Sequence, residues 1–114
     1  MSVESGDDIR VVFCTCPPDQ ATTLARALLE RRLVACVNVI PGVRSFYWWD
    51  GEVAEDGESL MVIKTPHARL PELEALLQEI HPYDVPEIVA LEASSVHSPY
   101  AAWIRANTTD VKTH

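Results

Sequence analysis

The sequence LVACVNVIPG, residues 33–42, decides the fold. Its first eight residues are apolar and largely β-branched except for Asn38, which predicts a strand covered on both faces. The Pro-Gly pair that ends it predicts a bend or bulge, because residues 43–49, VRSFYWW, again have the composition of a strand. Asp50-Gly51 is a hairpin-turn sequence, so the chain should return along residues 59–65 as the second arm of a long, two-part hairpin.

The hairpin is flanked on each side by a strand and a helix. Residues 9–15, IRVVFCT, and 87–92, EIVALE, have the composition of strands, and a second Asp-Gly pair at 56–57 predicts a bulge in the return arm. Helices are predicted where apolar residues recur on one helical face: Ala21, Leu24, Ala25, Leu28 and Leu29; Leu70, Leu73, Leu76, Leu77 and Ile80; and Tyr100, Trp103 and Ile104. The order β-α-β-β-α-β plus a terminal helix predicts an α+β, ferredoxin-like fold, with two helices on one face of a four-stranded antiparallel sheet.

Four consecutive aromatic residues, Phe46 to Trp49, lie on the extension of the second predicted strand. Neighbouring strand residues point to opposite faces of a sheet, so Trp48 and Trp49 cannot both pack under the same helices. A second copy of the sheet would cover the face that the helices leave open. The sequence therefore predicts self-association.

The chain has 114 residues, which predicts one domain over residues 9–106, with a disordered N-terminal tail at 1–8 and a frayed C-terminal tail at 107–114. Its 17 acidic and 9 basic residues give a net charge of −8, which argues against nucleic acid as a partner. No apolar run has the length of a membrane span, and residues 1–8 do not resemble a signal peptide. The odd number of cysteines, three, is typical of a reducing compartment, so we expect a cytoplasmic protein.

Three stretches together resemble the CutA family of divalent-cation tolerance proteins. They are Cys16-Pro17 followed by residues 33–42; SFYWWDG at 45–51 with Ile-Lys-Thr at 63–65; and HPYDVPEI at 81–88 followed by Tyr100 and Trp103. The resemblance extends from Val11 to Ile104. It implies a ferredoxin-like protomer, a tight homotrimer with an architecture like that of PII signalling proteins, and a role in metal tolerance, with copper binding attributed to some members.

Two cysteines are candidate metal ligands. Cys14 and Cys16 lie two residues apart at a strand end, so both thiols can point to one face, and thiolates bind soft ions such as Cu(I). His81 or another subunit would supply a third ligand. The helix that follows should favour the thiolate of Cys16. The alternative is that both are small buried hydrophobic residues, as free cysteines often are, and Cys36 is expected in the core.

The stretch HPYDVPE, residues 81–87, is the second candidate site. Glu87 at the head of an apolar strand needs a partner, and Lys64 is the one charge in the return arm of the hairpin. We therefore expect a ligand cleft beside a neighbouring subunit, formed by Lys64, Trp49, His81, Tyr83 and Glu87. The alternative is a rigid loop whose prolines fix the backbone and whose polar groups pair among themselves.

Other chemistry has little support in the sequence. The acidic residues Asp50, Glu52, Glu55, Asp56 and Glu58 lack the spacing of a calcium loop and predict a solvated hairpin tip. No hydrolase, zincin or P-loop motif is present, and a Cys16–His81 pair is the one conceivable nucleophile and base. We therefore expect a homotrimer that binds copper or another divalent cation in metal tolerance, without catalysis. The alternatives are a PII-like sensor of small molecules and a purely structural trimer.

Overall fold

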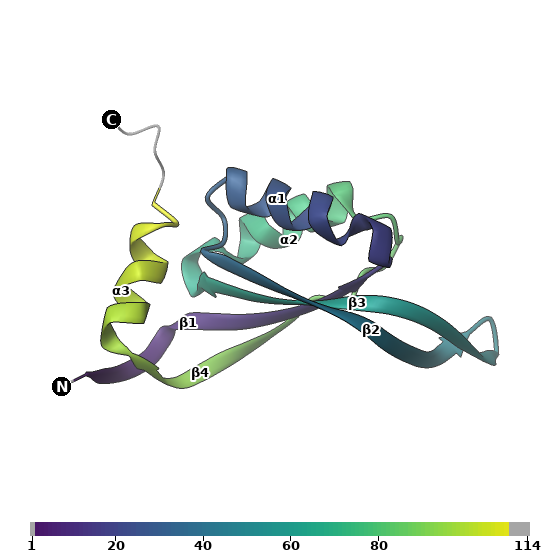
Figure 1. The fold of residues 1–114 in the computed structure, drawn as a ribbon, viewed down its shortest axis with the longest axis horizontal. Helices are drawn as coiled ribbons and strands as arrows, with labels where there is room; N and C mark the ends of the chain where they lie inside the picture. The colour runs from purple at the N-terminus through teal and green to yellow at the C-terminus, as the bar shows by residue number, and fades with distance from the viewer. Residues whose placement is uncertain (1, 110–114) are drawn as a thin grey trace.

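Four strands form one antiparallel sheet in the order β2-β3-β1-β4 in the computed structural model, which describes residues 2–109 (Figure 1). The strands are β1 (Val3–Cys16), β2 (Cys36–Trp49), β3 (Glu52–Pro66) and β4 (Val89–His97), and the helices are α1 (Ala21–Glu30), α2 (Leu70–Ile80) and α3 (Ser98–Ala106). Short 3₁₀ turns, Pro18–Gln20 and His67–Arg69, precede α1 and α2. The predicted βαββαβ order with a C-terminal helix is therefore confirmed.

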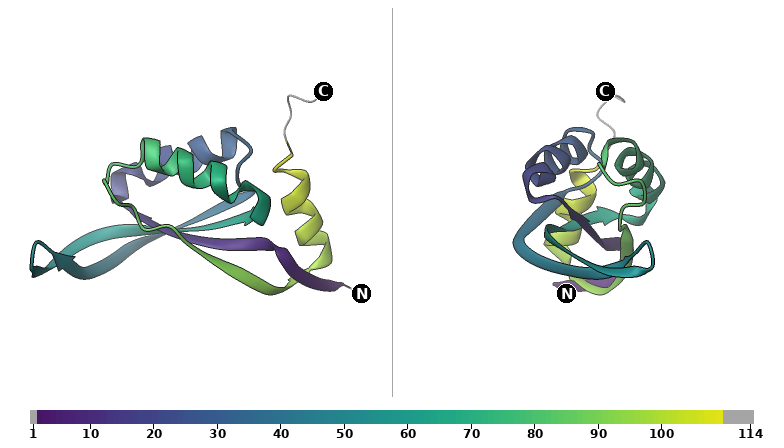
Figure 2. Two further views of the ribbon diagram at one scale, coloured as in Figure 1. Left: turned by 180° about the vertical axis from the view of Figure 1, so that it is seen from behind. Right: turned by 90° about the vertical axis from the view of Figure 1, so that its right-hand side faces the viewer.

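The main core lies between the sheet and the two helices that cover one of its faces, α1 and α2 (Figures 1 and 2). Alternate residues of β1 and β3 point into it, as the two-residue period of a strand requires. Its fully buried members on the strands and helices are Val12, Cys14 and Cys16 of β1, Met61 and Ile63 of β3, Leu24 and Leu28 of α1, and Leu73 and Leu77 of α2. Leu29, which the helical spacing also placed on the apolar face, is exposed.

The two-part hairpin extends beyond the body of the molecule (Figure 2). The register between β2 and β3 shifts between Ile40 and Val43, which confirms the bulge predicted at Pro41-Gly42. Asp50 and Gly51 both have positive φ, 53° and 81°, as a type I′ hairpin turn requires. The second bulge, predicted at 56–57, is absent from the hairpin as the structure describes it. The register between β2 and β3 runs without interruption from Val43 to Trp49.

The prediction of a disordered tail at residues 1–8 is wrong for the residues that the structure describes. Val3 begins β1 and pairs with His97 at the end of β4. Gly6 lies so close to Ala93 that a Cβ at this position would overlap the Ala93 carbonyl group. The polar composition of this segment did not reveal a strand, because its pairing partner lies at the other end of the chain.

Helix α3 closes the end of the sheet opposite the hairpin tip (Figure 1). Its Arg105 binds the carboxylates of Glu4, at 2.5 Å, and Asp8, at 2.7 Å, and the hydrogen bond to Arg105 lowers the pKa of Asp8. Thr108 is buried and its hydroxyl donates to the Ile104 carbonyl group, so the helix end is capped rather than frayed at this residue. Residues 110–114 of the predicted tail lie outside the described part of the chain.

The face of the sheet that α1 and α2 leave uncovered is mostly apolar, although Lys64 also lies on it opposite Val11, and we call it the open face. It carries the alternate residues Val11 and Phe13 of β1, Leu60 and Val62 of β3, and Val89 and Leu91 of β4. Phe13 lies at its centre, because it pairs with Val62 on one side and Val89 on the other. Val89 and Leu91 are 47% and 44% exposed, so within one chain this face lacks a cover.

Candidate functional site

His81 fixes the loop that follows α2. It is 6% exposed, and its Nδ1 accepts a hydrogen bond from the backbone N–H of Tyr83 at 3.1 Å. Its Nε2 therefore carries the proton and donates to the Thr15 carbonyl oxygen at 2.9 Å. With both ring nitrogens engaged, the imidazole ties the loop to the end of β1.

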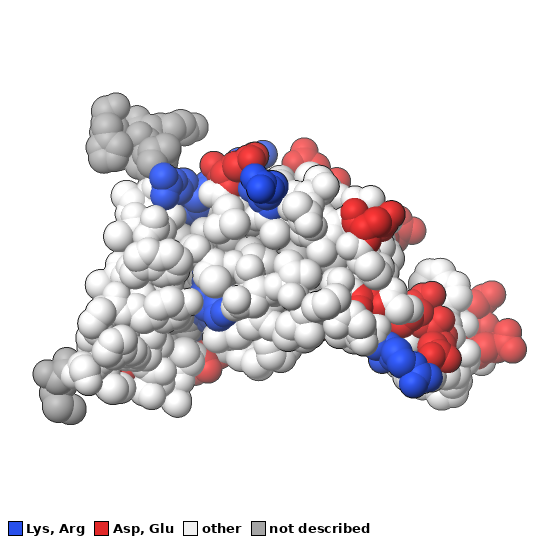
Figure 3. Space-filling view, in the orientation of Figure 1, with Lys and Arg blue, Asp and Glu red and all other residues white. Residues whose placement is uncertain are grey.

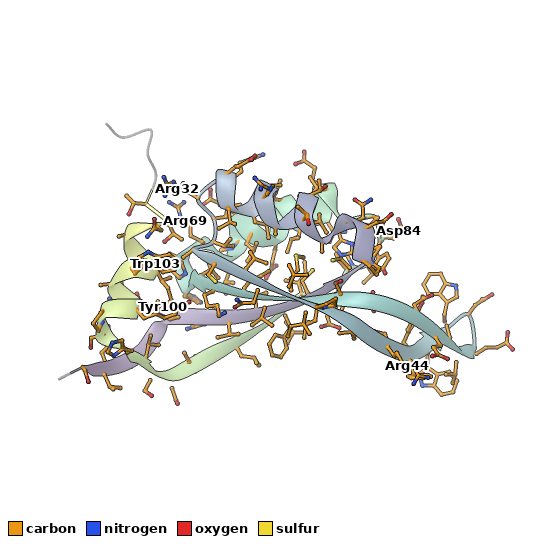
Figure 4. The ribbon with its side chains drawn as sticks, viewed as in Figure 1. Arg32, Arg44, Arg69, Asp84, Tyr100 and Trp103 are labelled. Atoms are coloured by element: carbon orange, nitrogen blue, oxygen red, sulfur yellow. The ribbon has the colours of Figure 1, made fainter. Side chains whose placement is uncertain are left out.

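A pocket of about 950 Å³ lies between this loop and the hairpin. It is lined by residues 45–49 of β2, Glu58 of β3, Thr15 of β1 and residues 83–87 of the loop. Thr15 alternates with Cys14 and Cys16, so its side chain points away from the helix layer, toward the side of the open face. Asp84 lies at the end of the molecule from which the hairpin extends (Figure 4). We call this site the hairpin pocket.

Two tyrosine–carboxylate pairs lie at the hairpin pocket, and all their members except Asp56 line it. The Tyr83 hydroxyl donates to Glu58 Oε2 at 2.7 Å, and the Tyr47 hydroxyl donates to Asp56. Burial, followed by the hydrogen bond to Glu58, raises the pKa of Tyr83, and the hydrogen bond to Asp56 raises the pKa of Tyr47. Both phenols therefore stay neutral at physiological pH, and they hold the two carboxylates in place.

The structure brings together three of the five residues predicted for the ligand cleft. Trp49, Tyr83 and Glu87 line the hairpin pocket, and His81 supports the loop from behind. Lys64 is not among the lining residues: it lies six residues along β3 from Glu58, roughly 20 Å away at about 3.3 Å per residue. Its ammonium group donates to Asn38 Oδ1 instead. Within one chain, then, the structure does not bring Lys64 and Glu87 together.

Glu58 was assigned to the solvated hairpin tip, and the structure corrects this. It is 6% exposed, whereas Asp50, Glu52, Glu55 and Asp56 are exposed. Glu58 continues the alternation of Leu60 and Val62, so its side chain points to the same side of β3. That alternation was the signal in the sequence. The closure of the loop over Glu58 depends on the contact with Tyr83, 25 residues later in the chain.

The two candidate thiols lie inside the core. Cys14 and Cys16 are both 0% exposed. Burial raises the pKa of Cys14 to about 12, and burial followed by the charge of Glu58 raises the pKa of Cys16. The helix was expected to favour a thiolate at Cys16, whereas burial and the charge of Glu58 act in the opposite direction on its pKa. Cys36, expected in the core, is half-buried. Within residues 2–109, no three His, Cys, Asp or Glu side chains form a group that could hold a metal ion.

The buried thiols lead to a prediction about their reactivity. In a Cys36→Ser variant, Cys14 and Cys16 should react with a thiol reagent at neutral pH no faster than the protein unfolds, because the thiolate is the reactive form. The reaction is followed by absorbance, in buffer and in denaturant. Fast reaction in buffer would show that the strand end opens and that its thiols are available to soft metals.

Comparisons with known proteins place the sequence in a family. The family model described as CutA1 divalent ion tolerance protein matches residues 10–107. This chain belongs to the CutA1 family. The divalent-cation tolerance protein CutA of Thermus thermophilus is 48% identical over 99 residues, which cover 86% of this chain and 96% of that protein. The match to human CutA is 42% identical over 104 residues and covers 90% of this chain but 58% of the human protein.

The solved structures agree with the CutA1 assignment. The structure of CutA from Synechococcus elongatus has a TM-score of 0.90 with this chain at 33% identity, covering 95% of this chain and 96% of that one. This CutA1 chain, in its described part, has no helix that is both long and apolar enough to span a membrane.

Proposed function

We propose that the chain assembles as a homotrimer that acts in tolerance to divalent cations without catalysing a reaction, and that it senses a small ligand in the hairpin pocket. The observation that carries the assembly is the open face. Six apolar residues from three strands form one continuous surface there, and contiguous apolar patches of this kind mark interfaces. The family resemblance supports three as the number of copies, and we propose the cytoplasm as the location.

The hairpin pocket favours a sensor of small molecules, like the PII-like trimers, and not a purely structural protein. Its volume of about 950 Å³ lies at the upper end of the range for small-molecule sites. Its walls come from β1, β2, β3 and the loop after α2, so a ligand would contact three of the four strands. Such a ligand can affect both the hairpin and the assembly.

Copper or another divalent cation is the ligand that the family name suggests, and Cys14, Cys16 and His81 stay the proposed residues for copper. Copper can reach these three residues only if the native structure opens locally. The two thiols are buried and the imidazole binds Thr15 and Tyr83, so Cu(I) uptake at these residues requires the end of β1 to open. We expect uptake to be slow in the native protein and to weaken strongly in Cys16→Ser.

The absence of catalysis is also part of the proposal. A Cys16–His81 pair would need an accessible thiol and a free imidazole nitrogen. Cys16 is 0% exposed with a raised pKa, and His81 Nε2 is occupied by the Thr15 carbonyl group. These contacts support a structural role for both side chains.

Sedimentation equilibrium at micromolar concentration tests the assembly. We expect one species with three times the protomer mass of 12.7 kDa. Because folding and assembly are linked, the melting temperature should rise with protein concentration. A stable monomer, or a melting temperature that does not depend on concentration, would rule out the proposed trimer.

A further inference from the structure

The charge of the hairpin pocket is uniformly acidic. Glu58, Asp84 and Glu87 contribute three carboxylates, and the described residues that line it include no Lys, Arg or His. Figure 3 shows acidic side chains gathered over the hairpin. An anionic ligand would be repelled at this site, because every formal charge in its walls has the same sign. The charge therefore favours a cation.

The walls of the pocket are also unusually aromatic. Phe46, Tyr47, Trp48, Trp49 and Tyr83 all line it. Within one chain Trp48 and Trp49 are 76% and 69% exposed, although both are large and apolar. The faces of such rings attract cations that are weakly hydrated, whereas a hydrated metal ion gains little from them.

The hairpin already holds one cation in this way. The Arg44 guanidinium lies 5.3 Å from the centroid of the Phe46 ring, and the same group is paired with Glu55 at 3.0 Å. Arg44 is labelled beside the hairpin in Figure 4 and is not among the residues that line the pocket. One ring of the aromatic run, Phe46, thus carries a cation of the same strand beside a carboxylate.

We propose that the hairpin pocket binds a small organic ammonium ion, a protonated amine, by placing its charge between the aromatic side chains and the carboxylates of Glu58 and Glu87. A bare divalent cation would need a dense set of oxygen or nitrogen ligands. No group of His, Cys, Asp or Glu side chains among residues 2–109 provides one. The inference rests on the proposed role of the pocket as a ligand site, and it assigns that site a chemical class.

The orientation of the carboxylates supports this assignment. Tyr83 binds one oxygen of Glu58, Oε2, and so fixes the carboxylate while leaving its other oxygen as an acceptor. Glu87 is exposed and forms no ion pair among the described residues. An alkylammonium ion offers N–H donors to these oxygens and an apolar body to the rings.

The test compares two probes of the same shape, neopentylammonium chloride and neutral neopentyl alcohol, at constant ionic strength. The readout is the indole N–H signals of Trp48, Trp49 and Trp103 in NMR spectra of the ¹⁵N-labelled full chain. Trp103 lies on α3, at the opposite end from the hairpin, and is the internal control (Figure 4). Magnesium chloride is titrated separately.

We expect the ammonium probe to shift the Trp48 and Trp49 signals in the millimolar range, while the alcohol binds about tenfold more weakly and Trp103 does not respond. Glu87→Gln should weaken the ammonium probe about threefold to fivefold, as loss of an exposed ion pair does. Glu58→Gln is the second variant, and Glu74→Gln, on the exposed surface of α2, is the matched control.

Each other outcome overturns the ligand class. Equal binding of the two probes would show a merely apolar pocket. A response to the alcohol or to magnesium alone would support the pocket as a ligand site but exclude an ammonium ion as its ligand. A response to none of the three would remove both the ammonium ion and the proposed sensing role, and the sedimentation result would still decide the trimer.

Discussion

Replacing Phe13 by Asp should abolish the trimer. Phe13 lies at the centre of the open face between Val62 and Val89, so each copy would bring a carboxylate into the proposed interface. A buried charge without a partner costs several kcal/mol, and a closed trimer would contain three of them. We expect sedimentation to show monomers or unfolded chains at concentrations at which the unmodified protein is a trimer.

Leu29→Asp is the matched control for this substitution. Leu29 is an apolar residue of α1 that is 38% exposed and lies on the helix layer, away from the open face. The same carboxylate there should leave the sedimentation coefficient unchanged. A trimer that survives Phe13→Asp would show that the copies meet through another surface.

The second large effect concerns two adjacent leucines. Leu28 is 0% exposed in the core between α1 and the sheet, and Leu29 is exposed. Leu28→Ala should lower the free energy of unfolding by about 2–5 kcal/mol, because it removes buried methyl groups and leaves a cavity. Leu29→Ala should lower it by about 0.5 kcal/mol or less.

Denaturant unfolding at a fixed protein concentration measures both variants, and circular dichroism confirms that each retains the helices. The pair shares its chemistry and its position along the chain, so the difference reports burial alone. Similar losses of stability in both variants would show that the exposed side of α1 is covered in the assembly.

Much of the fold follows from local patterns in the sequence. The turn at Asp50-Gly51, the bulge at Pro41-Gly42 and the two amphipathic helices each depend on residues that are close in the chain, and the structure has all of them. The N-terminal part of β1 does not follow from such a pattern. Its polar residues form a strand because Arg105 and β4 bind them from the other end of the sequence.

The candidate site shows the same division. The loop at 81–87 and Trp49 could be assigned from motifs, and three of the residues predicted for the cleft line the pocket. A partner for Glu87 could not be assigned, because a single charge on a neighbouring strand does not show how the two strands are aligned. The Lys64 ammonium group instead donates a hydrogen bond to Asn38. The sequence left open whether Cys14 and Cys16 are metal ligands or buried hydrophobic residues, because a helix end is visible in a sequence and the depth of burial is not; in the structure both are buried.

The pairing of Val3 with His97 affects how the chain folds during its synthesis. The residues of the hairpin, with its exposed aromatic side chains, are synthesised before those of β4 and α3, because β3 ends at Pro66 and β4 begins at Val89. Until then β1 is an edge strand with unpaired backbone groups, and such edges attract other chains. The last strand, β4, therefore also protects the edge of β1 from other chains. A ribosome that stalls before residue 97 would present a sheet prone to aggregation.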